Sequence, residues 1–390
     1  MTGTTANFAI SYPESTDFVT DGATAMETIA DKVDDILFAE VANNNLIING
    51  AMQVTQRSAV GTAVTGITTG GFKTADRWDL NMTTFGTWSQ TCIADAPTGS
   101  GFRNSLKMAC TSAYASPAAS NEMQIRQKIE GQNLQAIRKG TASANKLTLS
   151  FWVKAFQTGT FICELEDGDN SRNVSKSYTI NASNTWEYKS ISFPADTTGA
   201  FDNDANASLV VIWWLGAGSN FTSGTLATTW VTPTTANRAV GQTNVASSTS
   251  NTWFMTGASL TVGDVDVPFQ FKSFPDDLAA CQRYFYQMNA TGVYNFYAAG
   301  GAGSANGGNA QINMPVPFRA QAHTLTTSNV TLSDYAVNVT SGVLTISTAL
   351  SNLNTTSILF TSAGAYTVYR SYVLLANNTL TSSVSVSAEL

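Results

Sequence analysis

Alternating apolar and polar residues along the middle of the chain predict β-strands. Two segments alternate most clearly, and the residues on their apolar faces are Leu147, Leu149, Phe151 and Val153 in the first and Phe161, Cys163 and Leu165 in the second. The run Leu209–Leu215 is apolar on both faces, which predicts a central strand. Strands of this length, separated by Gly, Asn, Asp and Pro, predict a mainly β protein whose residues 46–275 form an antiparallel two-sheet jelly-roll sandwich.

Residues 1–45 have a different pattern, with apolar positions at helical spacing. Met26, Ile29, Val33 and Ile36 are three or four residues apart, so they form one stripe on a short coiled-coil-like helix. An isolated helix of this length is marginal in water, so the stripe must be covered. It either packs on the body of its own chain or joins a parallel bundle between subunits. In a bundle, Ile at the second core position favours three or four strands.

Downstream of the sandwich the pattern predicts a linker helix and a separate domain. Residues 276–289 begin with acidic residues and carry Leu278, Cys281 and Phe285 on one stripe, which predicts the linker helix. Residues 290–390 combine a glycine-rich run, 298–308, with short Thr, Ser and Val strands, and we expect a small β-domain at the distal tip. The glycine run lacks the lysine of a phosphate loop, so it indicates a mobile loop or a close approach of backbones.

The composition argues against an enzyme and against a nucleic-acid-binding protein. Only 12% of the 390 residues are charged, and His323 is the single histidine, which removes most acid–base chemistry at neutral pH. Residues 1–45 contain eight acidic residues and one basic residue, which accounts for the whole net charge of −7. The other 345 residues contain 19 acidic and 19 basic residues and are neutral as a whole. A neutral body with an acidic head lacks the basic surface that nucleic acid requires.

Cysteine usage and hydropathy predict a protein made in a reducing cytoplasm. The four cysteines are scattered along the sequence, so we expect buried thiols rather than disulfides or a zinc site. No secretory signal opens the chain, and Leu209–Leu215, the longest apolar run, is too short for a membrane helix. We therefore expect no membrane insertion.

Acidic loops are the candidates for a metal site. The carboxylates of Asp167, Asp169, Asp202 and Asp204 fall in two turns and are candidate calcium ligands, and no other cofactor is expected. The competing interpretation is ordinary turn chemistry, because Asp, Asn and Gly dominate turns. The same region could supply a glycosidase carboxylate pair, but acids beside exposed strand ends keep ordinary pKa values.

Aromatic residues are the candidates for sugar contacts. Trp230 lies in a Thr-rich loop, and Tyr294, Phe296 and Tyr297 adjoin the glycine run, so these four are candidate glycan contacts. For the last three, a contact between subunits is the alternative. The remaining tryptophans in strand patterns are expected to pack in the core, namely Trp152, Trp186, Trp213, Trp214 and Trp253.

Two stretches of the chain resemble bacteriophage virion proteins, including those of cyanobacterial and other aquatic phages. The opening YPESTDFVTDGATAMETIADKVDD is similar to the head of tail-fibre proteins. The stretch from NLIINGAMQVTQR through KLTLSFWVKAFQTGTFICELEDGDNSR to VDVPFQFKSFPDDLAACQRYFY resembles a tail-associated jelly-roll module that is itself similar to carbohydrate-binding modules.

The resemblance implies a non-enzymatic virion protein of the tail. It implies a homotrimeric tail fibre or appendage whose N-terminus attaches to tail or baseplate proteins and whose distal end binds a host surface polysaccharide or lipopolysaccharide. Avidity from several identical tips would compensate for weak single sugar contacts. The alternatives are a capsid or baseplate decoration or adaptor protein without receptor binding, and a polysaccharide-degrading enzyme.

Overall fold

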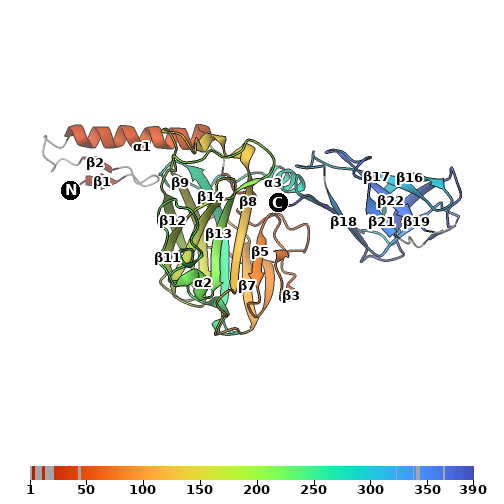
Figure 1. The fold of residues 1–390 in the computed structure, drawn as a ribbon, viewed down its shortest axis with the longest axis horizontal. Coiled ribbons are helices and arrows are strands. Elements are labelled where there is room, and N and C mark those ends of the chain that lie inside the picture. The colour runs from red at the N-terminus through yellow and green to blue at the C-terminus, as the bar shows by residue number, and fades with distance from the viewer. Residues whose placement is uncertain are drawn as a thin grey trace. The chain divides into compact units, whose positions relative to one another are not determined.

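The computed structural model describes residues 2–4, 11–13, 22–42, 45–321, 323–336, 338–339, 343–362 and 365–390. In the segment 22–42 it describes the side chains of residues 22 and 24–33. The chain divides into two compact units, Met1–Lys272 and Ser273–Leu390 (Figure 1). Each unit has its own hydrophobic core.

The first unit is an antiparallel jelly-roll sandwich of two six-stranded sheets, which confirms the predicted fold class (Figure 1). The first sheet, here the β10 sheet, contains in spatial order β11 (Arg172–Ile180), β10 (Gly159–Asp167), β13 (Ala207–Ala217), β8 (Glu122–Glu130), β5 (Asp79–Thr83) and β4 (Gly71–Phe72). The second sheet contains β12 (Glu187–Phe193), β9 (Leu147–Ala155), β14 (Thr252–Val262), β7 (Ser105–Ser112), β6 (Thr87–Ile93) and β3 (Val64–Ile67).

Smaller elements complete the first unit. The helix α1 (Gly22–Ala42) confirms the helix predicted near the N-terminus. The others are the strand pair β1 (Thr2–Thr4) and β2 (Ser11–Pro13), the short helix α2 (Ser219–Thr222), and the 3-10 helices η2 (Gly131–Asn133), η3 (Gln135–Ile137), η4 (Thr235–Asn237) and η5 (Val245–Ser247). None of the helices in the described part of the chain is long and apolar enough to span a bilayer.

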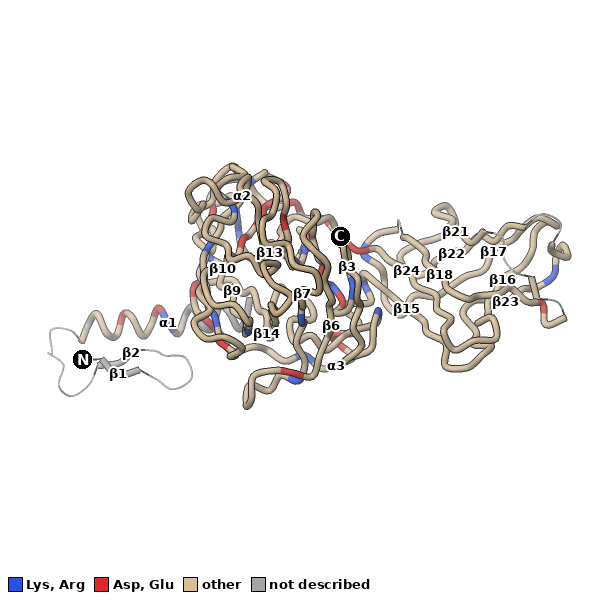
Figure 2. The backbone as a smooth tube through the Cα atoms, turned by 90° about the horizontal axis from the view of Figure 1, so that it is seen from below, with Lys and Arg blue, Asp and Glu red and all other residues tan. Residues whose placement is uncertain are grey.

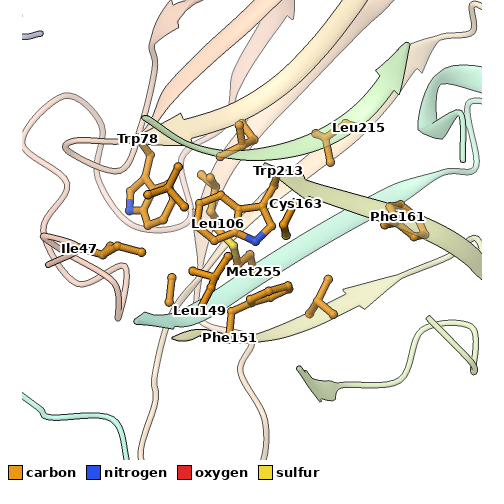
Figure 3. Packing of buried hydrophobic residues seen from close by; sticks show 14 of the residues in the cluster. Ile47, Trp78, Leu106, Leu149, Phe151, Phe161, Cys163, Trp213, Leu215 and Met255 are labelled. Atoms are coloured by element: carbon orange, nitrogen blue, oxygen red, sulfur yellow. The ribbon is translucent and has the colours of Figure 1, made fainter. Parts of the chain in front are cut away.

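The core lies between the two sheets and is centred on aromatic side chains (Figure 3). The ring of Trp213 on β13 packs edge-on at 5.5 Å from Trp78 and 5.7 Å from Phe151. The apolar faces predicted for β9 and β10 are buried in this core, as expected from strand alternation. Burying each large apolar side chain contributes about 1.5–3 kcal/mol. All four cysteines are buried thiols, as expected, and none of them is in a disulfide.

Strand β13 is buried on both faces, which confirms the central strand predicted from its sequence. It pairs with β10 on one side and with β8 on the other. Its second face, carrying Ile212 and Trp214, is covered by the segment that follows the strand, through Phe221, Leu226 and Ala239. Of the five tryptophans expected in the core, Trp213, Trp214 and Trp253 are fully buried, whereas Trp152 and Trp186 are half-buried.

The second unit contains the helix α3 (Phe274–Gln282) and two antiparallel sheets. The three-stranded sheet contains β15 (Phe285–Asn289), β24 (Ser383–Ser387) and β18 (Thr324–Ser328). The seven-stranded sheet contains β20 (Asn338–Val339), β19 (Val330–Ser333), β23 (Ser371–Ala376), β16 (Phe296–Ser304), β17 (Gly307–Asn313), β22 (Thr355–Thr361) and β21 (Val343–Ile346). Its core includes a cluster of three aromatic rings, Phe360, Tyr366 and Tyr372.

The helix predicted over 276–289 is shorter than expected. Ser273 caps the start of α3 by accepting a hydrogen bond from the backbone of Asp276, and the helix ends at Gln282. Residues Phe285–Asn289 are instead the strand β15, paired along its length with β24. The aromatic residues of this stretch suit a strand, and pairing with a segment about 100 residues away outweighs the helical spacing.

Candidate functional site

Polar side chains gather on the outer face of the β10 sheet, which is the face turned away from the core. Strand alternation places Glu164 and Glu166 of β10 there, because Cys163 and Leu165 point into the core. The strand register aligns Glu164 with Ile212, Ile212 with Arg126, and Arg126 with Asp79. The outer face therefore combines carboxylates, a guanidinium and apolar side chains in one row.

The carboxylates of this face are already paired within the chain. Arg238 donates from Nε to Glu164 Oε1 at 2.7 Å and from Nη2 to Glu166 Oε2 at 2.5 Å. Glu164 also accepts hydrogen bonds from Trp214 Nε1 at 2.9 Å and from Asn173 Nδ2 at 3.0 Å. Burial raises the pKa of Glu164, and the charge of Arg238 opposes this rise. Both oxygens of Glu164 thus bind fixed donors, an arrangement suited to stabilising the fold.

The end of β10 and the loop 196–199 come together in space around a lysine. Lys139 Nζ lies 2.5 Å from Asp167 Oδ2 and 3.1 Å from Asp196 Oδ2. It also donates to the carbonyl oxygens of Thr198 and Gly199, each at 2.8 Å. We call this group of four oxygens around Lys139 Nζ the lysine cage. Its side chains are almost fully buried, so the ammonium is a cation held by the protein itself.

The lysine cage argues against calcium at the four predicted ligands. Asp167 faces Lys139, while its other oxygen accepts the backbone N–H of Asp169. Asp169 in turn accepts the N–H of Asp202, and Asp204 accepts hydrogen bonds from Asn206. Among the described residues, no group of three or more His, Cys, Asp or Glu could hold a metal ion. These contacts favour the turn interpretation of the four carboxylates over the calcium interpretation.

The structure places Trp230 against the lysine cage. Lys139 Nζ lies 5.5 Å from the centre of the Trp230 indole and 5.2 Å from that of Phe201, within the range of cation–π contacts. Trp230 Nε1 donates to Pro194 O at 2.8 Å. The half-buried indole is thus engaged both through its ring and through its N–H.

The remaining aromatic candidates lie in the second unit and do not share one surface. Tyr294 and Phe296 are exposed, whereas Tyr297 is buried in the core of the unit. A hydrogen bond from the backbone N–H of Thr379 to Val293 O brings the segment before β16 next to the one that carries exposed Leu380. Tyr294 and Phe296 therefore stand near other exposed apolar side chains.

Large exposed apolar side chains are concentrated in the second unit. Of the 17 found among the described residues, 11 lie in this unit, although it holds only 118 of the 390 residues. Figure 2 shows that charged positions are frequent in the first unit and sparse in the second. Neutral, partly apolar surface of this kind is typical of a contact surface.

The glycine-rich run forms an open groove on the seven-stranded sheet. The groove has a volume of about 410 Å³. Its lining consists of Gly303, Ser304, Asn306, Gly307, Gly308, Asn309, Leu350, Leu359, Phe360 and Thr361. It combines amides and hydroxyls with apolar side chains and contains no charged residue. Its volume is within the range of small-ligand sites, about 300–1,000 Å³.

Glycines create this groove for two different reasons. Gly308 needs to be glycine because a Cβ there would collide with the carbonyl oxygen of Gly301, which confirms the predicted close approach of backbones. A Cβ at Gly303 would meet nothing within 4 Å. The groove is therefore open at these positions because glycine has no side chain that would fill it.

The predicted oligomerisation stripe on α1 is partly exposed in the single chain. Met26 is 66% exposed, Val33 is also exposed, and Ile29 is half-buried. The side chain of Ile36 lies outside the described residues. Where it is described, the stripe is thus not fully covered by its own chain.

Sequence reasoning missed the lysine cage and the groove lining. Lys139 and Asp196 lie in separate loops, and no local spacing marks them as partners. Leu359 lies on β22, which pairs with β17, and Leu350 lies in the loop before β22, so both line the groove. The glycine run was the one local signal for this site.

Comparisons with known proteins give distant structural likeness only. No family model and no curated protein matches the chain. An enzymatically active domain of tailspike protein 4 from bacteriophage CBA120 is 15% identical, with a TM-score of 0.30, over 56% of this chain and 21% of the tailspike. TmCBM61 in complex with β-1,4-galactotriose is 11% identical, with a TM-score of 0.27, over 56% of this chain and 98% of that one.

A third solved structure shows the same distant likeness to this chain. The family 11 carbohydrate-binding module of the cellulase Lic26A-Cel5E of Clostridium thermocellum is 12% identical, with a TM-score of 0.26, over 54% of this chain and 98% of the module. Only 21% of the tailspike chain is matched. These scores are low, so the likeness assigns no ligand, activity or assembly to this chain.

Proposed function

We propose that this protein is a non-enzymatic component of a bacteriophage particle, a homotrimeric tail fibre or tail appendage whose second unit binds a neutral host-surface glycan. The observation that carries the proposal is the uncharged groove over β16 and β17. Amide and hydroxyl groups match the hydroxyls of a sugar, and Leu350 and Leu359 match its C–H faces.

The chemistry of the first unit supports a binding role rather than catalysis. Its carboxylate pair, Glu164 and Glu166, shares Arg238, and both oxygens of Glu164 are hydrogen-bonded. A glycosidase acid must exchange a proton with its substrate, which such a tightly bound carboxylate does poorly. We therefore assign the first unit a non-catalytic role.

The exposed stripe of α1 supports self-association. Met26 and Val33 are apolar and exposed in the single chain, and burying them between parallel helices would remove this surface from water. Light scattering on the full chain should then give about 124 kDa, three times 41.3 kDa. Met26→Lys should shift the mass toward that of the single chain. A wild-type mass of one chain would refute the trimer.

Binding is tested on an array of purified bacterial lipopolysaccharides and capsular polysaccharides. Gly303→Gln adds a side chain at a groove-lining position where a Cβ meets nothing within 4 Å. Gly292→Gln is the matched control, because a Cβ there also meets nothing within 4 Å and the position does not line the groove. We expect the groove variant to lose at least about tenfold in apparent affinity and the control to bind like the wild type. Absence of wild-type binding across the array would contradict the proposal.

A further inference from the structure

Two tyrosines lie together at one end of the seven-stranded sheet. Strand β19 pairs with β23 so that Ser333 is opposite Val373, which places Tyr335 just beyond the start of β23. Tyr369 lies two residues before that strand, and its backbone N–H donates to Ala302 O of β16 at 2.8 Å. Both residues therefore belong to the same end of the sheet as the turn between β16 and β17.

Both tyrosines are presented to solvent from an unfavourable backbone. Tyr335 is 80% exposed and Tyr369 is 93% exposed. Their φ angles are +67° and +64°, in the left-handed region that bulky residues rarely adopt. Such a conformation costs on the order of 1 kcal/mol or more, and glycine or asparagine would fit better. Neither burial nor backbone geometry explains why tyrosine stands at these positions.

Polar contacts hold the two turns in place. Arg370 Nη1 lies 2.5 Å from Asp334 Oδ2, so the residues adjacent to the two tyrosines are joined by an ion pair. The N–H of Tyr335 donates to Ser333 Oγ at 3.0 Å. The N–H of Arg370 donates to Thr367 O at 3.2 Å, and the N–H of Thr367 to the hydroxyl of Tyr372 at 3.0 Å. The rings are thus displayed from turns that are already ordered.

We propose that Tyr335 and Tyr369 form a stacking platform for the neutral sugar rings of a polysaccharide, separate from the groove. The inference rests on the proposed function, because it names a second contact site for the same class of ligand. A tyrosine ring offers a flat apolar face with a hydroxyl at its rim and loses little side-chain entropy on binding. Arg370 and Asp334 neutralise each other, which favours an uncharged partner over an acidic or basic one.

The test compares glycine and phenylalanine at these positions in the full chain. The double variant Tyr335→Gly, Tyr369→Gly removes both rings and relieves both left-handed residues, so its melting temperature should equal or exceed that of the wild type. On the same polysaccharide array its apparent affinity should fall at least about tenfold. The double Phe variant should retain most of the binding. Leu380→Ala removes an exposed apolar side chain beyond the other end of β23 and should bind like the wild type.

The outcomes separate this inference from the proposed function. Unchanged binding by the double Gly variant, with Gly303→Gln still defective, would overturn the platform and leave the glycan proposal standing. Loss of binding together with a lower melting temperature would indicate a structural role and overturn the platform as well. Binding to host outer-membrane proteins but to no polysaccharide would overturn both proposals.

Discussion

Replacing Lys139 with methionine tests whether the lysine cage stabilises the sandwich. Methionine keeps much of the side-chain length but removes the ammonium. Asp167 Oδ2 and Asp196 Oδ2 then lose a partner at 2.5 and 3.1 Å. The carbonyl oxygens of Thr198 and Gly199 each lose a donor at 2.8 Å. Two carboxylates that are nearly inaccessible to water are left with one fewer cation between them.

The expected loss follows from the burial of the pair. Removing one partner of a buried ion pair costs about 3–5 kcal/mol, because the remaining charge stays desolvated. Arg172 still binds Asp196 after the substitution, which places the loss near the lower end, about 3 kcal/mol. For a domain of this size, about 2–4 °C is lost per kcal/mol, so the melting temperature should fall by roughly 10 °C.

The assay is urea unfolding at neutral pH, followed by tryptophan fluorescence, which reports on the buried indoles of the first unit. Lys146→Met is the matched control, because Lys146 pairs with Asp264 at the surface and should contribute less than about 1 kcal/mol. If Lys139→Met costs no more than this control, the reasoning about the lysine cage is refuted.

Acid titration gives an independent check on the lysine cage. Burial opposes ionisation of Asp196, but hydrogen bonds from Arg172 and Lys139 outweigh it and lower the pKa of this carboxyl. A lowered pKa in the folded state contributes stability above the unfolded pKa of about 3.9, and this stability is lost as the pH falls. The difference in stability between wild type and Lys139→Met should therefore stay constant at neutral pH and narrow as the pH falls from about 5 toward about 3. A difference that stays constant over this acidic range would contradict this role for Asp196.

Three further predictions concern His323, the glycine-rich run and metal ions. Burial lowers the pKa of His323, so the unfolded chain binds a proton at this residue more readily than the folded chain does. The second unit should therefore lose stability as the pH falls below about 6.5. In His323→Asn the melting temperature of this unit should depend less on pH, and an unchanged dependence would contradict the prediction. Gly308→Ala should destabilise the second unit by about 1–3 kcal/mol in thermal melts, because its Cβ meets the carbonyl of Gly301, whereas Gly303→Ala should be close to neutral. Neither EDTA nor millimolar calcium should change the melting temperature of the first unit, because Lys139 already supplies a cation to Asp167 and backbone or amide donors bind Asp169 and Asp204. A clear rise of the melting temperature with calcium would show that a metal binds there.

Local patterning determined much of the fold. The alternation in β9 and β10 and the doubly apolar run of β13 were read directly from the sequence and are found as strands in the core. These features are local, because the side-chain period of a strand depends only on neighbouring residues. The same reasoning failed at Phe285–Asn289, where pairing with β24 outweighs helical spacing. It identified the glycine run as a close approach of backbones but not as the floor of a groove.

The candidate sites required the tertiary structure. Lys139 meets Asp167 and Asp196 only because two loops of the sandwich converge with the end of β10. Tyr335 and Tyr369 are 34 positions apart and come to one end of a sheet because β19 and β23 are neighbours. Sequence alone determined which segments are strands and which faces are apolar, since these depend on short-range geometry. The tertiary structure decided which charges are neutralised and which aromatic rings reach solvent, because both depend on contacts between residues far apart in the chain.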